Sequence, residues 1–233
     1  MKALRILLAV LSTLAIVLLT LYSEQLTNAA LDAWQFGWMN AYLFPRVLLV
    51  FLTISILIVF LPLLNLYKVG KWVFGIVIIA ASVGGYLAVN LPYIDDWSRE
   101  GETLDSSLDG NQIEAQLNSM RPDYNGLVFL VLPNCPYCFD AFPNIVRLKE
   151  RNPNLDVSIF VSAMDSSKFQ FFKEHIPETE LPIHMIRDYK QATALSKGKF
   201  PTFLYFKNER LVYRWSNNQF GYPALDWIEA GLE

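Results

Sequence analysis

The chain has 233 residues, a formal net charge of −3 and a hydrophobic fraction of 53%. That fraction exceeds the roughly 45–50% of soluble domains, so part of the chain is expected to lie outside a water-soluble core. Lys and Arg number 5 against 2 Asp and Glu before residue 94, and 14 against 20 after it. The acidic C-terminal part argues against nucleic acid and anionic lipid as its partners.

The excess of apolar residues is concentrated in three uncharged runs, at residues 6–22, 47–64 and 72–94. Each run is about as long as the ~20 residues that a helix needs to cross a bilayer. We therefore predict that residues 1–94 form a membrane domain with three transmembrane helices, at about 4–22, 43–64 and 72–93.

The positive charges around these runs predict their orientation. Lys2 and Arg5 precede the first span, and Lys68 and Lys71 lie between the second and third, whereas the loop at 23–41 has no Lys or Arg. Because Lys and Arg are retained on the cytoplasmic side, the N-terminus is predicted to be cytoplasmic. The C-terminal part is then extracytoplasmic.

The first span has an alternative interpretation as a cleaved signal peptide, with a basic start at residues 1–5 and a weak cleavage site near Ala29. Its apolar run is longer than the roughly 7–15 residues of a signal peptide, so a retained anchor is the prediction. The spans contain no cysteine. We expect them to tether the protein; binding of a membrane partner or a quinone is the alternative.

Residues 95–110 are polar and acidic, and they are predicted to be a linker. Strands and helices then alternate along residues 111–233, which predicts an α/β domain. The expected helices are 111–120, a segment from the cysteines to about Arg151, 165–175, a short one through Ala194, and one starting at Pro223. The expected strands are 127–132, 157–161, 182–187, 202–206 and 211–215.

Cys135 and Cys138 are the only cysteines, and three explanations are open for them: a structural disulfide, part of a metal site, or a redox pair. A disulfide across two residues closes a very small loop and therefore stabilises the fold little. A zinc site needs about four ligands, and His175 and His184 match no common zinc spacing. We therefore expect neither a metal nor another cofactor.

The local pattern favours the redox pair. A buried strand ending at Leu132 is followed by Cys135 at the start of a helix, where backbone N–H groups and the helix dipole favour a thiolate. Cys135 is thus the expected attacking thiol. Cys138, nearly one helical turn later, is placed to resolve a mixed disulfide. Pro136 stiffens the first turn without breaking it.

A strand, the sequence CPYC, a helix with Pro143 and a later KFPTFLYF together resemble the thioredoxin superfamily. Within it, the chain is similar to the membrane-tethered thioredoxin-like (TlpA/DsbE-like) envelope oxidoreductases, over roughly residues 111–233. The resemblance implies a central mixed sheet with flanking helices. It also implies a cis peptide bond before Pro201, and substrate binding by Pro136, Tyr137, Phe200 and Pro201.

The chain departs from cytosolic thioredoxins at two positions. Phe129 occupies the place of their buried acid, and Asn134 replaces the tryptophan before the first cysteine. Proton transfer to Cys138 is therefore expected to use water or another group.

The resemblance implies a thiol–disulfide oxidoreductase on the bacterial inner membrane, with its thioredoxin-like domain in the periplasm. Its expected partners are protein thiols and disulfides and a membrane or envelope redox protein. The direction of electron flow stays open, because it depends on the reduction potential of the pair relative to its partner. The alternative function is a binding or assembly module whose dithiol is not catalytic.

Overall fold

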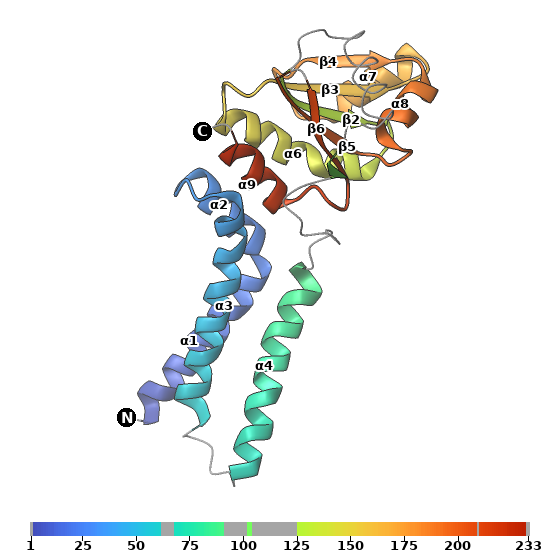
Figure 1. Ribbon diagram of the computed structural model, residues 1–233. Coiled ribbons are helices and arrows are strands. Elements are labelled where there is room, and N and C mark those ends of the chain that lie inside the picture. The colour runs from blue at the N-terminus through green and yellow to red at the C-terminus, as the bar shows by residue number, and fades with distance from the viewer. Residues whose placement is uncertain (1, 62–67, 91–101, 104–124, 209, 232–233) are drawn as a thin grey trace. The chain divides into compact units, whose positions relative to one another are not determined.

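The computed structural model describes residues 2–61, 68–90, 102–103, 125–208 and 210–231 (Figure 1). The chain forms two compact units, Met1–Tyr93 and Ile94–Glu233. The helix predicted at 111–120 and most of the predicted linker lie outside the described residues.

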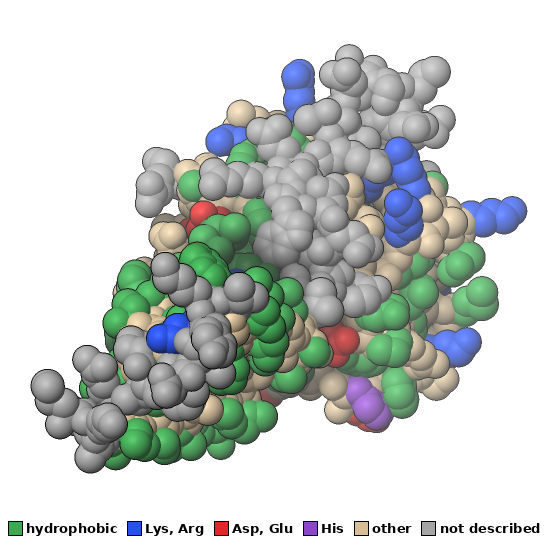
Figure 2. Space-filling view, turned by 90° about the horizontal axis from the view of Figure 1, so that it is seen from below, with side chains coloured by type: hydrophobic (Ala, Val, Ile, Leu, Met, Phe, Trp, Pro, Cys, Tyr) green, Lys and Arg blue, Asp and Glu red, His purple; other side chains and the backbone are tan. Residues whose placement is uncertain are grey.

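The N-terminal unit consists of helices, and its outward side chains are largely hydrophobic (Figure 2). The helices are α1 (Lys2–Leu21), α2 (Ser23–Asp32), α3 (Trp38–Phe60) and α4 (Lys68–Asn90). By length and composition, the segments Trp38–Val59 and Gly70–Val89 are able to cross a membrane. The pair Ile6–Leu21 and Ser23–Asp32, bent by 75°, is a third candidate if it forms one span.

The segment expected as a loop at 23–41 is partly helical. It contains α2, and α3 begins at Trp38, earlier than the predicted start of the second span. Polar side chains hold α2 in place: Ser23 Oγ and Tyr86 Oη of α4 share a buried hydrogen bond of 2.6 Å, and Thr27 Oγ1 donates to the Ser23 carbonyl. The helix therefore depends on contacts with another part of the unit, which an apolar run in the sequence does not reveal.

The C-terminal unit contains a six-stranded sheet in the order β1-β6-β5-β2-β3-β4. Strands β2, β3 and β4 are parallel, and the other pairings are antiparallel, so the predicted central mixed sheet is confirmed. The strands are β1 (Glu102–Thr103), β2 (Gly126–Val131), β3 (Val157–Ser162), β4 (Ile183–Ile186), β5 (Thr202–Lys207) and β6 (Arg210–Ser216). The helices are α6 (Pro136–Arg151), α7 (Ser166–His175), α8 (Tyr189–Ser196) and α9 (Tyr222–Ala230).

Strand β1 lies in the segment that was predicted to be a linker. Its two residues nevertheless pair antiparallel with β6 at Arg214 and Tyr213. Part of that polar segment therefore completes an edge of the sheet.

The side chains of β2 alternate between two apolar layers. The Phe129 ring lies 6.4 Å from Phe142 of α6 and 5.0 Å from Phe203 of β5. On the other face, Val128 and Leu130 pack in a cluster with residues of α8. Every residue of β2 is buried, which explains its continuous apolar sequence.

The far end of α6 is held against α9. Arg151 donates from Nε and Nη2 to the two carboxylate oxygens of Glu229, at 3.0 and 3.1 Å, and Asn152 Nδ2 donates to the same carboxylate at 3.0 Å. Two parallel hydrogen bonds fix the geometry of such a pair better than a single contact does. The helix that carries the cysteines is thereby anchored at the end opposite to them.

Gly126, at the start of β2, has φ of +141°, and a Cβ there would overlap the Asp156 carbonyl. That carbonyl accepts the Leu127 N–H at 2.8 Å, so it cannot move away without cost. We expect Gly126→Ala to destabilise the C-terminal unit by at least about 1–3 kcal/mol. Hydrogen exchange of β2 and β3 in the full-length protein in detergent measures the loss of protection.

Gly231→Ala is the matched control, because Gly231 has φ of −78°, which any residue adopts. Wild-type protection of β2 in the Gly126→Ala protein would contradict the prediction.

Candidate functional site

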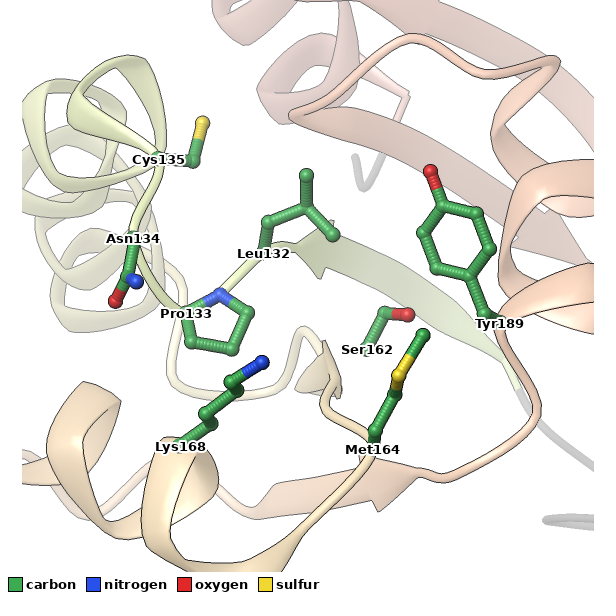
Figure 3. A pocket seen from close by; sticks show the side chains of 8 residues that line it. All are labelled: Leu132, Pro133, Asn134, Cys135, Ser162, Met164, Lys168 and Tyr189. Atoms are coloured by element: carbon green, nitrogen blue, oxygen red, sulfur yellow. The ribbon is translucent and has the colours of Figure 1, made fainter.

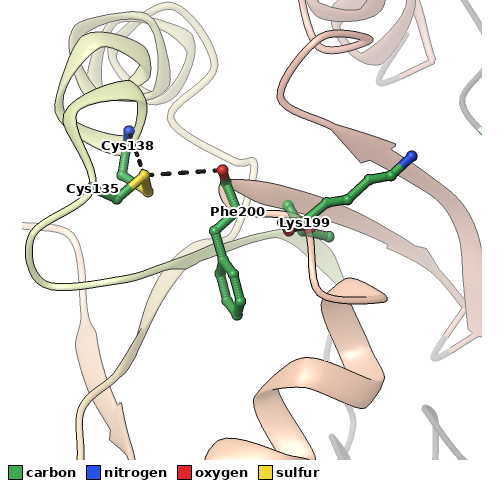
Figure 4. Close-up of a disulfide and its surroundings, with 5 residues drawn as sticks. Cys135, Cys138, Lys199 and Phe200 are labelled. Carbon is green, nitrogen blue, oxygen red and sulfur yellow. Dashed lines mark hydrogen bonds between the residues drawn. A yellow bond between two sulfur atoms is a disulfide. The ribbon is translucent and has the colours of Figure 1, made fainter.

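Cys135 and Cys138 form a disulfide where the loop after β2 enters α6 (Figure 4). Their Cα atoms are 5.2 Å apart. Cys135 is the N-cap residue of α6 and has extended backbone angles, while Pro136 opens the helix. A proline is tolerated there because the N–H that it lacks would have no partner within the helix.

The sulfur of Cys135 occupies the place of an N-cap acceptor. The Cys138 N–H points at Cys135 Sγ at 3.2 Å and at the Cys135 carbonyl at 3.0 Å. The Phe139 N–H also donates to that carbonyl, at 3.3 Å. One backbone donor, the Cys138 N–H, and the positive end of the helix dipole thus face this sulfur, an arrangement that favours a thiolate over a thiol after reduction.

The two sulfurs differ in access. Cys138 is fully buried, with 0% of its surface exposed, whereas Cys135 is partly exposed. Pro136 and Tyr137 between them are both exposed. A second protein can therefore reach Cys135, while Cys138 can be reached only through it.

The fold brings Phe200 and Pro201 to the same place. The peptide bond between them is cis, and the Phe200 carbonyl oxygen lies 3.9 Å from Cys135 Sγ (Figure 4). Pro201 is buried, and Phe200 packs against the apolar cluster on the α8 face. A backbone segment 65 residues away in sequence thus lies beside the partly exposed sulfur.

An aromatic layer fills the sheet face that α6 covers. Phe129 is fully buried and stacks on Phe203, and Phe203 stacks on Phe220 with 3.6 Å between ring centroids. No residue of β2 carries a carboxyl group. Proton transfer at the buried Cys138 must therefore use water or a group from another element.

A pocket of about 240 Å³ opens beside Cys135 (Figure 3). The loop between β2 and α6 forms one wall, and residues that follow the carboxyl ends of β3 and β4 form the other. Its lining residues are Leu132, Pro133, Asn134, Cys135, Ser162, Met164, Lys168 and Tyr189.

Of these residues, Cys135 was predicted from the sequence, whereas Met164, Lys168 and Tyr189 were not. The available signal was their position in the chain, since each follows a predicted strand. The carboxyl ends of neighbouring parallel strands meet at one edge of a sheet, where α/β proteins commonly bind ligands.

The histidines lie in ordinary structural environments. His175 Nδ1 donates a hydrogen bond at 2.8 Å to the Phe171 carbonyl, and its ring stacks on the Phe171 ring, while His184 stacks on Phe160. Among the described residues, no group of three or more His, Cys, Asp or Glu side chains is arranged to hold a metal ion.

Comparison with known proteins gives no match to a family model or to a curated protein. One similar solved structure is a secreted disulfide oxidoreductase of Mycobacterium tuberculosis, homologous to E. coli DsbE. The two sequences are 15% identical, the TM-score is 0.39, and the match covers 45% of this chain and 80% of the other chain. Another similar structure is described as a thiol:disulfide interchange protein DsbE from Chlorobium tepidum. The two sequences are 12% identical, the TM-score is 0.38, and the match covers 42% of this chain and 71% of the other chain.

The start of α7, which carries one pocket wall, is capped by Asp165. Its carboxylate accepts hydrogen bonds from Ser167 Oγ at 2.6 Å and from the Lys168 N–H at 2.9 Å. The Ser167 hydroxyl, followed by the Lys168 N–H, lowers the pKa of Asp165 below its ordinary value of 3.8. Because the folded pKa is the lower one, the cap contributes fully above the unfolded pKa and is lost as pH falls through the folded pKa.

We therefore expect the first turn of α7 to lose hydrogen-exchange protection, corrected for intrinsic rates, as pH falls below about 4. Asp165→Ala should lack this protection at every pH, whereas Asp165→Asn should keep it without the acid transition, because Asn caps helices about as well as Asp. An acid transition of wild-type size in Asp165→Asn would show that another group is responsible.

Proposed function

We propose that this chain is a membrane-anchored, extracytoplasmic thiol–disulfide oxidoreductase of the thioredoxin superfamily that acts on protein substrates. One observation carries the proposal: Cys135 offers a partly exposed sulfur at the N-terminus of α6, with the buried Cys138 sulfur bonded to it. A structural disulfide across so short a loop would stabilise the fold little, and it would not need one exposed sulfur.

The chemistry proceeds in two exchanges. In the reducing direction, the Cys135 thiolate attacks a substrate disulfide, one substrate sulfur leaves as a thiolate, and a mixed disulfide forms. The Cys138 thiolate then attacks Cys135 Sγ and releases the second substrate sulfur. The substrate gains two electrons and the pair becomes a disulfide, which a dithiol donor reduces again. The oxidising direction is the same sequence reversed.

Pro136, Tyr137, Phe200 and Pro201 are the proposed substrate-binding residues. The first two are exposed between the cysteines, and the Phe200 carbonyl lies 3.9 Å from Cys135 Sγ. An extended substrate segment whose cysteine reaches Cys135 would therefore pass beside the Phe200 backbone, which can hydrogen-bond to it without regard to sequence.

The proposed anchor is a set of three spans in a bacterial inner membrane, with a cytoplasmic N-terminus. Two long apolar helices and a bent third candidate support the spans. The positions of Lys2, Arg5, Lys68 and Lys71 support the orientation. A disulfide is also best maintained on the outer side of that membrane.

A binding module with an inert dithiol is the second candidate. It is favoured by large exposed apolar side chains around the cysteines: Tyr137 at 46%, Met164 at 68% and Tyr189 at 47%. Such side chains suit the docking of another protein whether or not electrons are exchanged.

Cys135→Ser is expected to lower insulin reduction by the full-length protein in detergent, with dithiothreitol as electron donor, by more than about 100-fold, because the nucleophile is lost. Cys138→Ser should still attack and should accumulate a mixed disulfide with the substrate, visible on a non-reducing gel. Wild-type turnover by Cys135→Ser, or no trapped complex with Cys138→Ser, would instead favour the binding module.

The orientation predicts that a membrane-impermeant maleimide labels Cys135 from outside intact spheroplasts after mild reduction. Lysis should not increase the labelling, because the outer face is already accessible. Cys135→Ser is the control for specificity. Labelling that appears only after lysis would reverse the proposed orientation.

A further inference from the structure

We propose that the pocket beside Cys135 selects substrates with an acidic side chain next to the reacting cysteine, and that Lys168 is the specificity-determining residue. This inference rests on the proposed function and adds a substrate class to it.

The position of the pocket ties it to the reaction. Cys135 is itself a lining residue, so the pocket lies beside the residue whose sulfur receives the substrate. A substrate cysteine that reaches this sulfur must bring its neighbouring side chains to the same opening. At about 240 Å³, the pocket can hold one of them.

The pocket combines apolar walls with one charge. Leu132, Pro133 and Met164 offer apolar surface to the stem of a side chain. Figure 3 shows Lys168 extending toward Pro133 on one side and Tyr189 presenting its hydroxyl group on the other. Apolar walls that reduce the access of water strengthen an interaction between charges.

The charged side chain in the described lining of the pocket is positive. Among the described residues that line the pocket, Lys168 alone has a charged side chain, and the other polar side chains are the uncharged ones of Asn134, Ser162 and Tyr189. The nearby Asp165 carboxylate accepts from Ser167 and from the backbone N–H of Lys168 and also interacts with the Lys168 charge, but Asp165 is not among the described residues that line the pocket. A substrate carboxylate would be attracted by the Lys168 ammonium group, whereas a substrate ammonium would meet a like charge.

The proposed preference for acidic side chains comes from the pocket and not from the net charge of the C-terminal part. The chain after residue 94 carries 14 Lys and Arg against 20 Asp and Glu, so its overall charge does not attract acidic proteins. Lys199 is close in sequence to Phe200, but it does not line the pocket and points away from the disulfide in Figure 4. Lys168 therefore supplies the positive charge at this opening.

The test uses the full-length protein in detergent and three peptide disulfides that differ only beside the reacting cysteine, with Glu, Gln or Lys on both sides. Wild-type protein should reduce the Glu peptide with a kcat/KM about twofold to fivefold above that of the Lys peptide, the size expected for an exposed ion pair. The ratio should fall toward one as salt is raised, because salt screens exposed charges.

Lys168→Gln should bring the ratio close to one, and Lys168→Glu should invert it while the Gln peptide is still reduced. Lys173→Glu is the matched control, since Lys173 lies on the same helix and does not line the pocket. It should keep the wild-type preference.

Equal reduction of the three peptides by wild-type protein, or an unchanged preference in Lys168→Glu, would overturn the inference and leave the proposed function standing. Failure of the wild-type protein to reduce any of the peptides or insulin would instead overturn the proposed function, and this inference with it.

Discussion

The placement of one sulfur at the N-terminus of α6 is the constraint on which the site depends. Cys135 serves as the N-cap, so the Cys138 N–H in the first turn of the helix faces its sulfur. This geometry is held from both sides. Strand β2 is buried in the middle of the sheet, and the Arg151–Glu229 pair fixes the far end of the helix to α9. Because the junction between β2 and α6 is held rigidly, the position of the Cys135 sulfur is set by the fold.

A layer of aromatic rings fills the sheet face beside the site. Phe129, Phe203 and Phe220 stack in sequence on the sheet face that α6 covers. The rings stabilise the core through the apolar area that they bury. They leave β2 without a proton acceptor, so the buried Cys138 depends on its partner, on water or on another element for protonation.

The edge of the sheet at the carboxyl ends of β2, β3 and β4 gathers the remaining parts of the site. The Cys135 loop, the loop before α7 and the start of α8 meet there and enclose the pocket, while the Phe200 carbonyl approaches the sulfur. The charge of this opening differs in sign from that of the C-terminal part as a whole. Attraction by Lys168 therefore acts only at contact distance, where it discriminates between side chains more than it speeds encounter.

The sequence alone determined the elements whose causes are local: the buried strand β2, the helix that begins after Cys135, and strands β5 and β6. It also pointed to Phe200 and Pro201, through resemblance. Only the tertiary structure decided that β1 joins the sheet, that α2 is a helix tied to Tyr86, and that Lys168 and Tyr189 share a pocket with Cys135. The physical reason is that these features arise from contacts between segments distant in the chain, which leave no periodic pattern in either segment.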